Sequence, residues 1–246
     1  MIDLHCHILP GIDDGAADIE MALAMARAAV DDGIVTVACT PHITAGVYNN
    51  TAPAIRVAID TLQAALAQAG IVLNLTIGAD VHLAPDLGAG LRSGKIPTLG
   101  GSRYFLFEPP HHILPPRLHD FAFNLVAAGY IPILTHPERL TWIDAHYRLV
   151  EDMANGGIVI QVTAASLTGH FGRRAKYWAE RMLDDGLIDL IATDAHDTRR
   201  RPPILSRARD FVAHKLTDEV ATRLVATNPL RILENVLVKE CGAQDA

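Results

Sequence analysis

The chain contains few of the features that mark secreted or membrane proteins. Its three cysteines, Cys6, Cys39 and Cys241, are an odd number without Cys-x-x-Cys spacing, which argues against a disulfide framework or a thiolate metal site and predicts free thiols. Charge, glycine or proline interrupts every apolar run before it could cross a bilayer, and the N-terminus has no basic region followed by a hydrophobic one. We therefore expect a cytoplasmic protein without membrane insertion.

Aromatic residues and positive charge are also scarce. Aromatics make up 5% of the 246 residues, whereas 50% are hydrophobic and 20% are charged, a balance that can bury a large aliphatic core. The formal net charge of −7 disfavours broad binding to nucleic acid. No repeat, low-complexity tract or Ser/Gly linker marks a second domain. We expect one α/β domain over residues 1–246. The sequence does not indicate whether the protein is a monomer or an oligomer.

Short runs rich in valine, isoleucine and leucine alternate with longer helical patterns, which is typical of repeated strand-helix units around a parallel sheet. Seven runs are predicted as strands: 2–4, 35–39, 72–77, 104–107, 131–134, 158–162 and 190–192. Five helices are predicted: 18–32, 51–69, 117–128, 173–185 and 228–238, the first capped by Asp18 and the last by Asn228. The segment 83–101 is the least regular and is either an excursion near a site or an ordinary connection.

Residues that can bind a metal accompany six of the seven predicted strands. They are Asp3, His5 and His7 with the first strand, then His42, Asp80, Glu108 and His136 after the next four, and Asp194 and His196 after the seventh. The C-terminal ends of the strands of a parallel barrel open on one face, so these distant residues would converge there. Histidines with structural roles would show no such relation to the strands. The pattern therefore predicts a metal site.

The remaining histidines lack this relation. His82, two residues beyond Asp80, is a secondary candidate, and the others are expected to be solvated or structural: His111, His112, His119, His146, His170 and His214. Cys6 lies between His5 and His7 and should point to the opposite face, into the core, because side chains alternate along a strand. Cys39 is likewise expected to be buried.

Five motifs occur in an informative order: DLHCHILPGIDDG, TPH, EPP, THPER and TDAH. They resemble the PHP (polymerase and histidinol phosphatase) metallophosphoesterases, and HILPGIDDG favours the bacterial CpsB/YwqE-type protein-tyrosine phosphatases of capsule and exopolysaccharide systems. The resemblance covers essentially the whole chain. It implies a distorted seven-stranded, TIM-like (β/α) barrel with three metal ions at the C-terminal ends of the strands, in agreement with the seven predicted strands.

The resemblance also implies ligands for each ion. They are His5, His7, Asp80 and Asp194 for the first, Asp80, Glu108 and His136 for the second, and Asp14, His42 and His196 for the third. Manganese is the metal that the family implies, and nitrogen and oxygen donors also suit iron or zinc. Asp80 stands where the family usually has glutamate, which leaves the occupancy of the second site open.

Residues around the ligands have expected supporting roles. Asp3 would orient a histidine ligand from outside the metal shell. Gly11 and Gly15 would let the chain turn past the cavity, so that Asp14 returns to the third ion while Asp13 faces away. By the same resemblance, Arg139 and Arg201 would contact phosphate, for which a guanidinium is well suited. Arg199 and Arg200 are expected to be solvated.

These expectations give a mechanism. Clustered divalent ions lower the pKa of a bridging water and supply hydroxide for in-line attack on the phosphorus of phosphotyrosine. No general acid is assigned, and a phenol, with a pKa of about 10, leaves more readily than an alkyl alcohol. Neither Cys6 nor Cys39 is followed six residues later by an arginine, which disfavours a thiol-based phosphatase.

The leading interpretation is a metal-dependent protein-tyrosine phosphatase that acts on the tyrosine-rich tail of a kinase of polysaccharide synthesis. One alternative is another PHP phosphoesterase, with histidinol phosphate or a nucleic-acid end as substrate. A second alternative, suggested by Asp80 alone, is a weakly active barrel that binds its kinase partner and regulates assembly.

Overall fold

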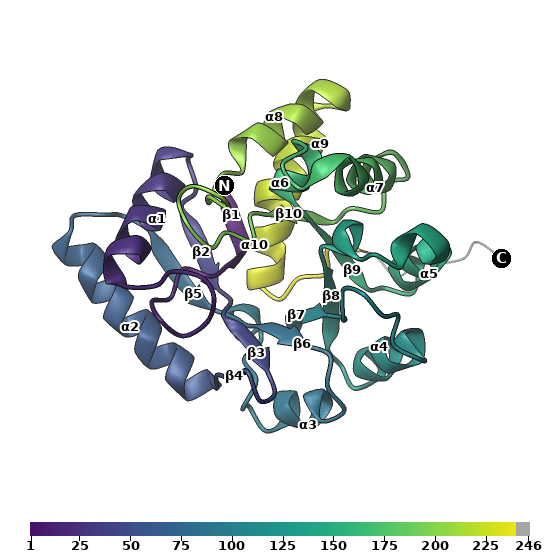
Figure 1. Ribbon diagram of the computed structural model, residues 1–246, viewed down its shortest axis with the longest axis horizontal. Coiled ribbons are helices and arrows are strands. Elements are labelled where there is room, and N and C mark those ends of the chain that lie inside the picture. Colours follow the sequence, from purple (N-terminus) through teal and green to yellow (C-terminus); the bar gives the residue numbers. More distant parts are fainter. Residues whose placement is uncertain (240–246) are drawn as a thin grey trace.

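Parallel strands form the centre of the protein in two sheets, as the computed structural model of residues 1–239 shows (Figure 1). The first sheet has the order β1-β2-β5, with β1 at Ile2–Cys6, β2 at Thr36–Cys39 and β5 at Asn74–Ile77. The second has the order β10-β9-β8-β7-β6-β3-β4. Its strands are β3 (His42–Thr44), β4 (Tyr48–Asn49), β6 (Asp80–His82), β7 (Tyr104–Glu108), β8 (Ile131–Thr135), β9 (Val159–Thr163) and β10 (Leu190–Ala192). Among the described strands, only the short hairpin of β3 and β4 is antiparallel.

The two sheets share chain segments. Strands β2 and β3 are successive pieces of one segment, interrupted at Thr40 and Pro41, and β5 and β6 are likewise interrupted at Gly78 and Ala79. Proline cannot donate to a strand ladder, which is consistent with the break at Pro41. At Gly78 a Cβ would lie 2.7 Å from Leu99 Cδ2, so the absence of a side chain allows close packing there. At the other side, a parallel bridge joins Cys6 to Ala195, just beyond β10. The strand ends that carry the candidate ligands are thereby brought close together.

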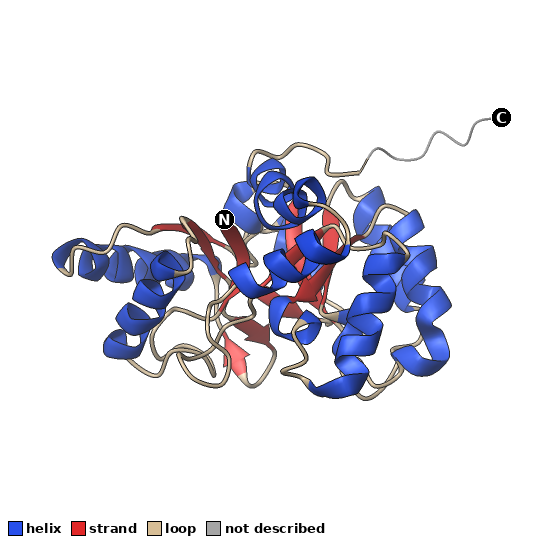
Figure 2. Ribbon diagram, turned by 90° about the horizontal axis from the view of Figure 1, so that it is seen from above, coloured by secondary structure: helices blue, strands red, loops and turns tan. Residues whose placement is uncertain are grey.

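Helices lie outside the strands, as the second view shows (Figure 2). They are α1 (Ile19–Asp31), α2 (Ala52–Gln68), α3 (Leu87–Arg92), α4 (Leu118–Ala127), α5 (Ile143–Asn155), α6 (Ala164–Leu167), α7 (Gly172–Asp184), α8 (Ser206–Lys215), α9 (Asp218–Thr222) and α10 (Asn228–Leu233). A large apolar cluster fills the space between helices and strands, and a smaller one joins Leu4, Ile133 and other strand residues to Ile232 of α10. None of the helices within residues 1–239 combines the length and hydrophobicity that a membrane span requires.

The predicted elements are largely confirmed. All seven strands are present within two residues of their predicted bounds, and four of the five helices are present within one residue. Asp18 caps α1, as predicted, by accepting a hydrogen bond from the Met21 backbone N–H at 2.8 Å. The prediction that Cys6 and Cys39 are free and buried is confirmed, whereas the third cysteine, Cys241, lies outside the described residues.

The prediction for the last helix is right in its first residue but wrong in the capping role of Asn228 and in its C-terminal end. Asn228 has helical backbone angles (φ −65°, ψ −45°) because helical structure runs without a break from α9 through a π-helical turn at Arg223–Thr227 into α10. The Asn228 side chain is used for tertiary structure instead, since its Nδ2 donates to the buried Asp189 carbonyl at 2.7 Å. The helix also ends at Leu233 rather than near residue 238.

The segment 83–101 is an ordered connection between β6 and β7. It contains α3, which buries Leu87 and Leu91, and a single 3-10 turn at Leu99–Gly101. Five helices were not predicted, namely α3, α5, α6, α8 and α9.

Candidate metal centre

The nine predicted ligands meet at the end of the strands where β1, β7, β8 and β10 finish. His5 Nε2 lies 3.2 Å from His7 Nε2, and His7 Nε2 lies 3.4 Å from Asp194 Oδ1. The other six come from β3, β6, the ends of β7 and β8, and nearby loops: Asp14, His42, Asp80, Glu108, His136 and His196. Except for Asp14 and His42, all of these side chains are buried. Residues up to 191 positions apart in the sequence are therefore close neighbours in space.

The donor atoms fall into five overlapping groups, in each of which all atoms lie within 4.8 Å of one another. They are His7, Asp14, His42 and His196; His5, His7 and Asp80; His5, His136 and Asp194; His42, His82 and Glu108; and Glu108, His111 and His136. The first group contains the whole predicted third set and adds His7. The predicted first set is divided between the second and third groups, in which Asp80 and Asp194 each lie close to His5.

Unpaired polar atoms in this cluster fit a divalent cation. Both carboxylate oxygens of Asp80, His136 Nδ1 and His196 Nε2 are buried and make no hydrogen bond within the described chain. Buried polar atoms are nearly always paired, so several unpaired atoms within one cluster need a common partner. Imidazole nitrogens and carboxylate oxygens without a thiolate suit manganese, iron or zinc.

Two residues outside the predicted ligand set fix the first histidines. His5 Nδ1 donates to Gln161 Oε1 at 2.8 Å, and His7 Nδ1 donates to Asp13 Oδ2 at 2.7 Å. Each bond leaves Nε2 free to face the cluster, as the outer partners of metal-binding histidines do. Gln161 was not among the residues predicted from the sequence. Its signal was a lone amide in the apolar sixth predicted strand, the strand without a candidate ligand.

The expected orientation of Asp13 is wrong. Its side chain is fully buried and points toward the site, where it also accepts hydrogen bonds from the backbone N–H groups of His42 (3.1 Å) and Gly15 (2.9 Å). Asp14 is half exposed and lies 3.5 Å from His42 Nε2 and 3.4 Å from His196 Nε2. Both aspartates face the cluster because the loop folds back on His7.

Asp3 supports the site differently from the prediction. Its carboxylate accepts from the backbone N–H of His5 (3.3 Å) and from the backbone and hydroxyl of Thr193 (2.9 and 2.5 Å), not from an imidazole ring. Burial raises the pKa of Asp3 to about 6, although these donors favour its charged form. Asp3 thus ties β1 to the segment after β10 and positions the backbone of His5 rather than its ring.

Two further histidines lie against Glu108. His82 Nε2 is 2.6 Å from Glu108 Oε2, and His111 Nε2 is 2.9 Å from Glu108 Oε1. The prediction that His111 lies apart from the strand-end cluster is therefore wrong, because the loop after β7 turns back at the two prolines after Glu108. The other five histidines that were predicted to be solvated or structural belong to none of the donor groups among the described residues.

Charge pairing holds the side chains of the cluster together. Burial disfavours a charged imidazole, but the carboxylates of Asp13 and Asp194 outweigh it and raise the pKa of His7 to about 10. Burial likewise disfavours the ionised form of Asp194, yet His5 and Arg139 hold the pKa of this carboxyl well below its usual range. Without metal, the ionised Asp194 and the protonated His7 are therefore neighbours in the site.

Arg139 and Arg201 share one carboxylate oxygen. The Nη1 of Arg139 and the Nη2 of Arg201 both contact Asp194 Oδ2. The Phe171 ring lies next to both guanidinium groups, with its centroid 4.6 Å from Arg139 Cζ and 5.8 Å from Arg201 Cζ. The two predicted phosphate-binding side chains thus stand together at the edge of the cluster.

Parallel strands that end in clustered imidazoles and carboxylates, with two arginines beside them, are the architecture of a metallohydrolase. The family model described as "Capsular polysaccharide synthesis, CpsB/CapC" matches residues 1–234. The chain belongs to this CpsB/CapC family.

Known relatives agree with this assignment. The chain is 37% identical over 201 residues to tyrosine-protein phosphatase YwqE of Bacillus subtilis, covering 82% of this chain and 79% of YwqE. It is 28% identical over 245 residues to tyrosine-protein phosphatase CpsB of Streptococcus pneumoniae, covering 97% of this chain and all of CpsB. A crystal structure from work on YwqE and CpsB, described as unique metal-dependent tyrosine phosphatases, superposes with a TM-score of 0.92 at 34% identity and covers 96% of this chain and 95% of that chain.

Proposed function

We propose that the protein is a metal-dependent protein-tyrosine phosphatase whose substrate is a phosphorylated tyrosine kinase of capsule or exopolysaccharide synthesis. The observation that carries the proposal is the convergence of nine nitrogen and oxygen donors next to a pair of arginines. The relatives described as tyrosine phosphatases support the substrate class. A cytoplasmic location remains a prediction from the sequence.

The proposed architecture is one domain with a distorted seven-stranded barrel. Counting β2 with β3 and β5 with β6 gives seven parallel strands, in agreement with the seven predicted from the sequence. The bridge between Cys6 and Ala195 supports closure, as do the hydrogen bonds from Asp194 N to His5 O (2.8 Å) and from His7 N to Ala195 O (2.9 Å).

The proposed cofactor is three divalent ions, with manganese the first choice. By the family resemblance, the ligands would be His5, His7, Asp80 and Asp194 for one ion, Asp80, Glu108 and His136 for a second, and Asp14, His42 and His196 for a third. Of these three sets, the third lies within a single donor group of the structure. Such ions supply an acidified water as the nucleophile near neutral pH and offset the negative charge of a phosphate.

The chain's own residues would bind and orient the phosphate. Arg139 and Arg201 offer guanidinium N–H groups at one edge of the cluster, where they can capture phosphoryl oxygens and turn the phosphorus toward the donor groups. Phe171 limits the positions of both guanidinium groups by packing against them. Gln161 and Asp13 keep the rings of His5 and His7 in fixed orientations. Little proton transfer to the leaving phenol is needed.

The test is turnover of a phosphotyrosine peptide in parallel with histidinol phosphate and a 5′-phosphorylated oligonucleotide. With manganese present, we expect kcat/KM for the peptide to exceed that for either rival substrate by at least about tenfold, and we expect metal analysis to find more than one ion per chain. A phosphoserine peptide of the same sequence is the matched control for the leaving group. No turnover of the phosphotyrosine peptide, with or without added manganese, contradicts the proposal.

A further inference from the structure

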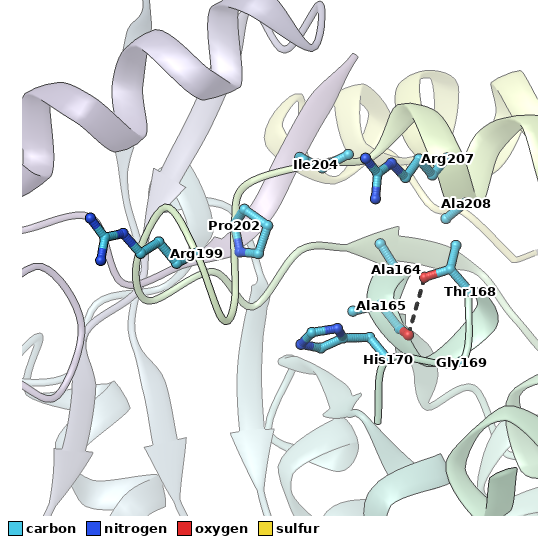
Figure 3. Close-up of a pocket in the computed structure, with 10 residues that line it drawn as sticks. All are labelled: Ala164, Ala165, Thr168, Gly169, His170, Arg199, Pro202, Ile204, Arg207 and Ala208. Atoms are coloured by element: carbon cyan, nitrogen blue, oxygen red, sulfur yellow. Dashed lines mark hydrogen bonds between the residues drawn. The ribbon is translucent and has the colours of Figure 1, made fainter. Parts of the chain in front are cut away.

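A hollow of about 380 Å³ lies between the end of α6, the turn into α7, the loop before α8 and α8 itself (Figure 3). Its lining includes Ala164, Thr168, His170, Arg199, Pro202 and Arg207. We call it the basic hollow because each of its ionisable lining residues, His170, Arg199 and Arg207, is basic. This is a local exception in a chain whose formal net charge is −7.

The basic hollow adjoins the candidate metal centre. His170 is followed by Phe171, the ring that packs against Arg139 and Arg201. On the other wall, Arg201 lies between Arg199 and Pro202, which both line the hollow. A peptide whose phosphate was held by Arg139 and Arg201 would therefore extend past the hollow within a few residues of its phosphotyrosine.

Two basic side chains of the hollow are available to a ligand. Figure 3 shows Arg207 and His170 extending from opposite walls toward the side where Pro202 lies, whereas the Arg199 side chain extends away from the other lining residues. Neighbouring arginines are engaged, since Arg201 pairs with Asp194 and Arg209 pairs with Asp210 at 3.2 Å. Within residues 1–239, by contrast, the arginine–carboxylate ion pairs do not include Arg207.

The rest of the lining limits what the hollow can accept. Ala164, Ile204 and Ala208 provide apolar surface, and the Thr168 hydroxyl already donates to the Ala165 carbonyl at 3.2 Å. A volume at the lower end of the range of ligand pockets suits one side chain and a short length of backbone. An unpaired guanidinium above apolar surface is complementary to a short side chain with a terminal carboxylate.

We propose that the basic hollow is a peptide subsite that binds the carboxylate of an aspartate or glutamate near the phosphotyrosine of the substrate, with Arg207 as its main partner. This inference rests on the proposed function and adds a sequence preference to it. The subsite contributes to substrate selection, while the metal centre and the two site arginines carry the chemistry.

The experiment compares phosphotyrosine peptides with alanine at every other position and glutamate or glutamine at one position, from three residues before the phosphotyrosine to three residues after it. At one or more positions, glutamate should raise kcat/KM about two- to fivefold over glutamine, mainly through a lower KM, as a partly exposed ion pair allows. Arg207→Gln should remove this preference, so that the glutamate and glutamine peptides have equal kcat/KM. Arg56→Gln is the control, because Arg56 is an exposed arginine on α2 whose loss changes the net charge equally.

Each outcome decides the inference. If all peptides are hydrolysed without a preference for glutamate, the subsite is overturned and the proposed function stands. The same conclusion follows if Arg56→Gln and Arg207→Gln reduce the preference equally. If no peptide is hydrolysed, the proposed function fails, and fluorescence anisotropy with labelled peptides decides the subsite. Tighter binding of the glutamate peptide that Arg207→Gln abolishes then supports it, and equal binding of the two peptides overturns it.

Discussion

At the scale of single residues, two candidate ligands have an unusual backbone. His136 and Asp194 have positive φ angles of 37° and 52°, in the left-handed region that only a few per cent of non-glycine residues adopt. Both follow a strand, β8 or β10, at the point where the chain turns over the site. Such a conformation costs about 1 kcal/mol or more, so it indicates that the direction of the side chain matters more here than local stability.

Substituting these two residues should abolish hydrolysis while the protein stays folded. Asparagine is the better replacement, since alanine would add strain at a positive φ. We expect His136→Asn and Asp194→Asn each to lower kcat on a phosphotyrosine peptide by about 100-fold or more and to reduce the metal content, because each loses a ligand. His119→Asn, on the outer helix α4, is the control. A variant that kept most of its turnover with an unchanged circular dichroism spectrum would show the ligand assignment to be wrong.

Asp80 is the candidate ligand at which the family resemblance implies a glutamate instead. Its carboxylate lies 3.5 Å from His5 Nε2 and 3.3 Å from His42 Nδ1, and both of its oxygens lack a hydrogen bond within the described chain. We expect Asp80→Glu to bind manganese more tightly and to raise kcat several-fold, because the longer side chain can bridge two ions more evenly. Calorimetric metal titration and steady-state kinetics measure the two effects. An unchanged or lower rate would remove the argument for a weakly active, kinase-binding barrel.

At the scale of elements, the loop after β1 folds two aspartates back onto His7, the residue that directly follows this strand. Gly11 permits the first turn with a φ of +71°. Gly15 has a different role, because a Cβ at this position would lie 2.0 Å from the His7 carbonyl oxygen. The backbone hydrogen bond from Ala16 N to His7 O, at 3.0 Å, depends on the same close approach. Closeness of the two backbones, rather than a left-handed conformation, requires glycine at position 15.

Gly15→Ala should therefore damage both the fold and the site. Overpacking of this kind costs about 1–3 kcal/mol in the free energy of unfolding, and displacement of the loop should also weaken metal binding through Asp13 and Asp14. Gly156→Ala is a matched control, since its Cβ would meet the Phe123 ring at 1.9 Å, away from the site. Urea unfolding should show a loss of stability for both variants, whereas metal titration should show a loss of affinity for Gly15→Ala alone. Equal metal affinity for the two variants would contradict this account.

At the scale of the whole molecule, metal binding and protonation should be coupled. The carboxylates around His7 raise its pKa to about 10, so its imidazole is protonated at neutral pH without metal. A metal ligand must be the neutral imidazole, and binding therefore displaces this proton. The apparent metal affinity therefore rises as the pH rises toward 10, because fewer protons remain on His7 to be displaced.

We expect manganese to release protons on binding at pH ~7, and its affinity to increase about tenfold per pH unit for each proton displaced. Titration in weakly buffered solution counts the protons, and calorimetry at several pH values between about 6.5 and 8.5 gives the slope. Asp13→Asn should reduce the slope, because it removes a carboxylate that raises the pKa of His7. An affinity that did not change with pH would show that His7 is not a ligand.

Local residue patterns determined much of this protein. Short apolar runs between helical patterns predicted the strands, and glycines predicted the helix ends. The recurrence of His, Asp and Glu at strand ends predicted which residues would meet, because parallel strands present their C-terminal ends on one face. The failure at Asn228 is also informative. A good capping residue was recruited to a distant carbonyl, and local preference could not reveal that demand.

Only the tertiary structure decided what surrounds each of those residues. The inward direction of Asp13, the contact of His111 with Glu108, the support of His5 by Gln161 and the hollow beside Arg201 all depend on loops whose paths are set by packing between segments far apart in the chain. A sequence specifies side-chain spacing along one strand, but contacts between loops arise from long-range packing that no local period encodes.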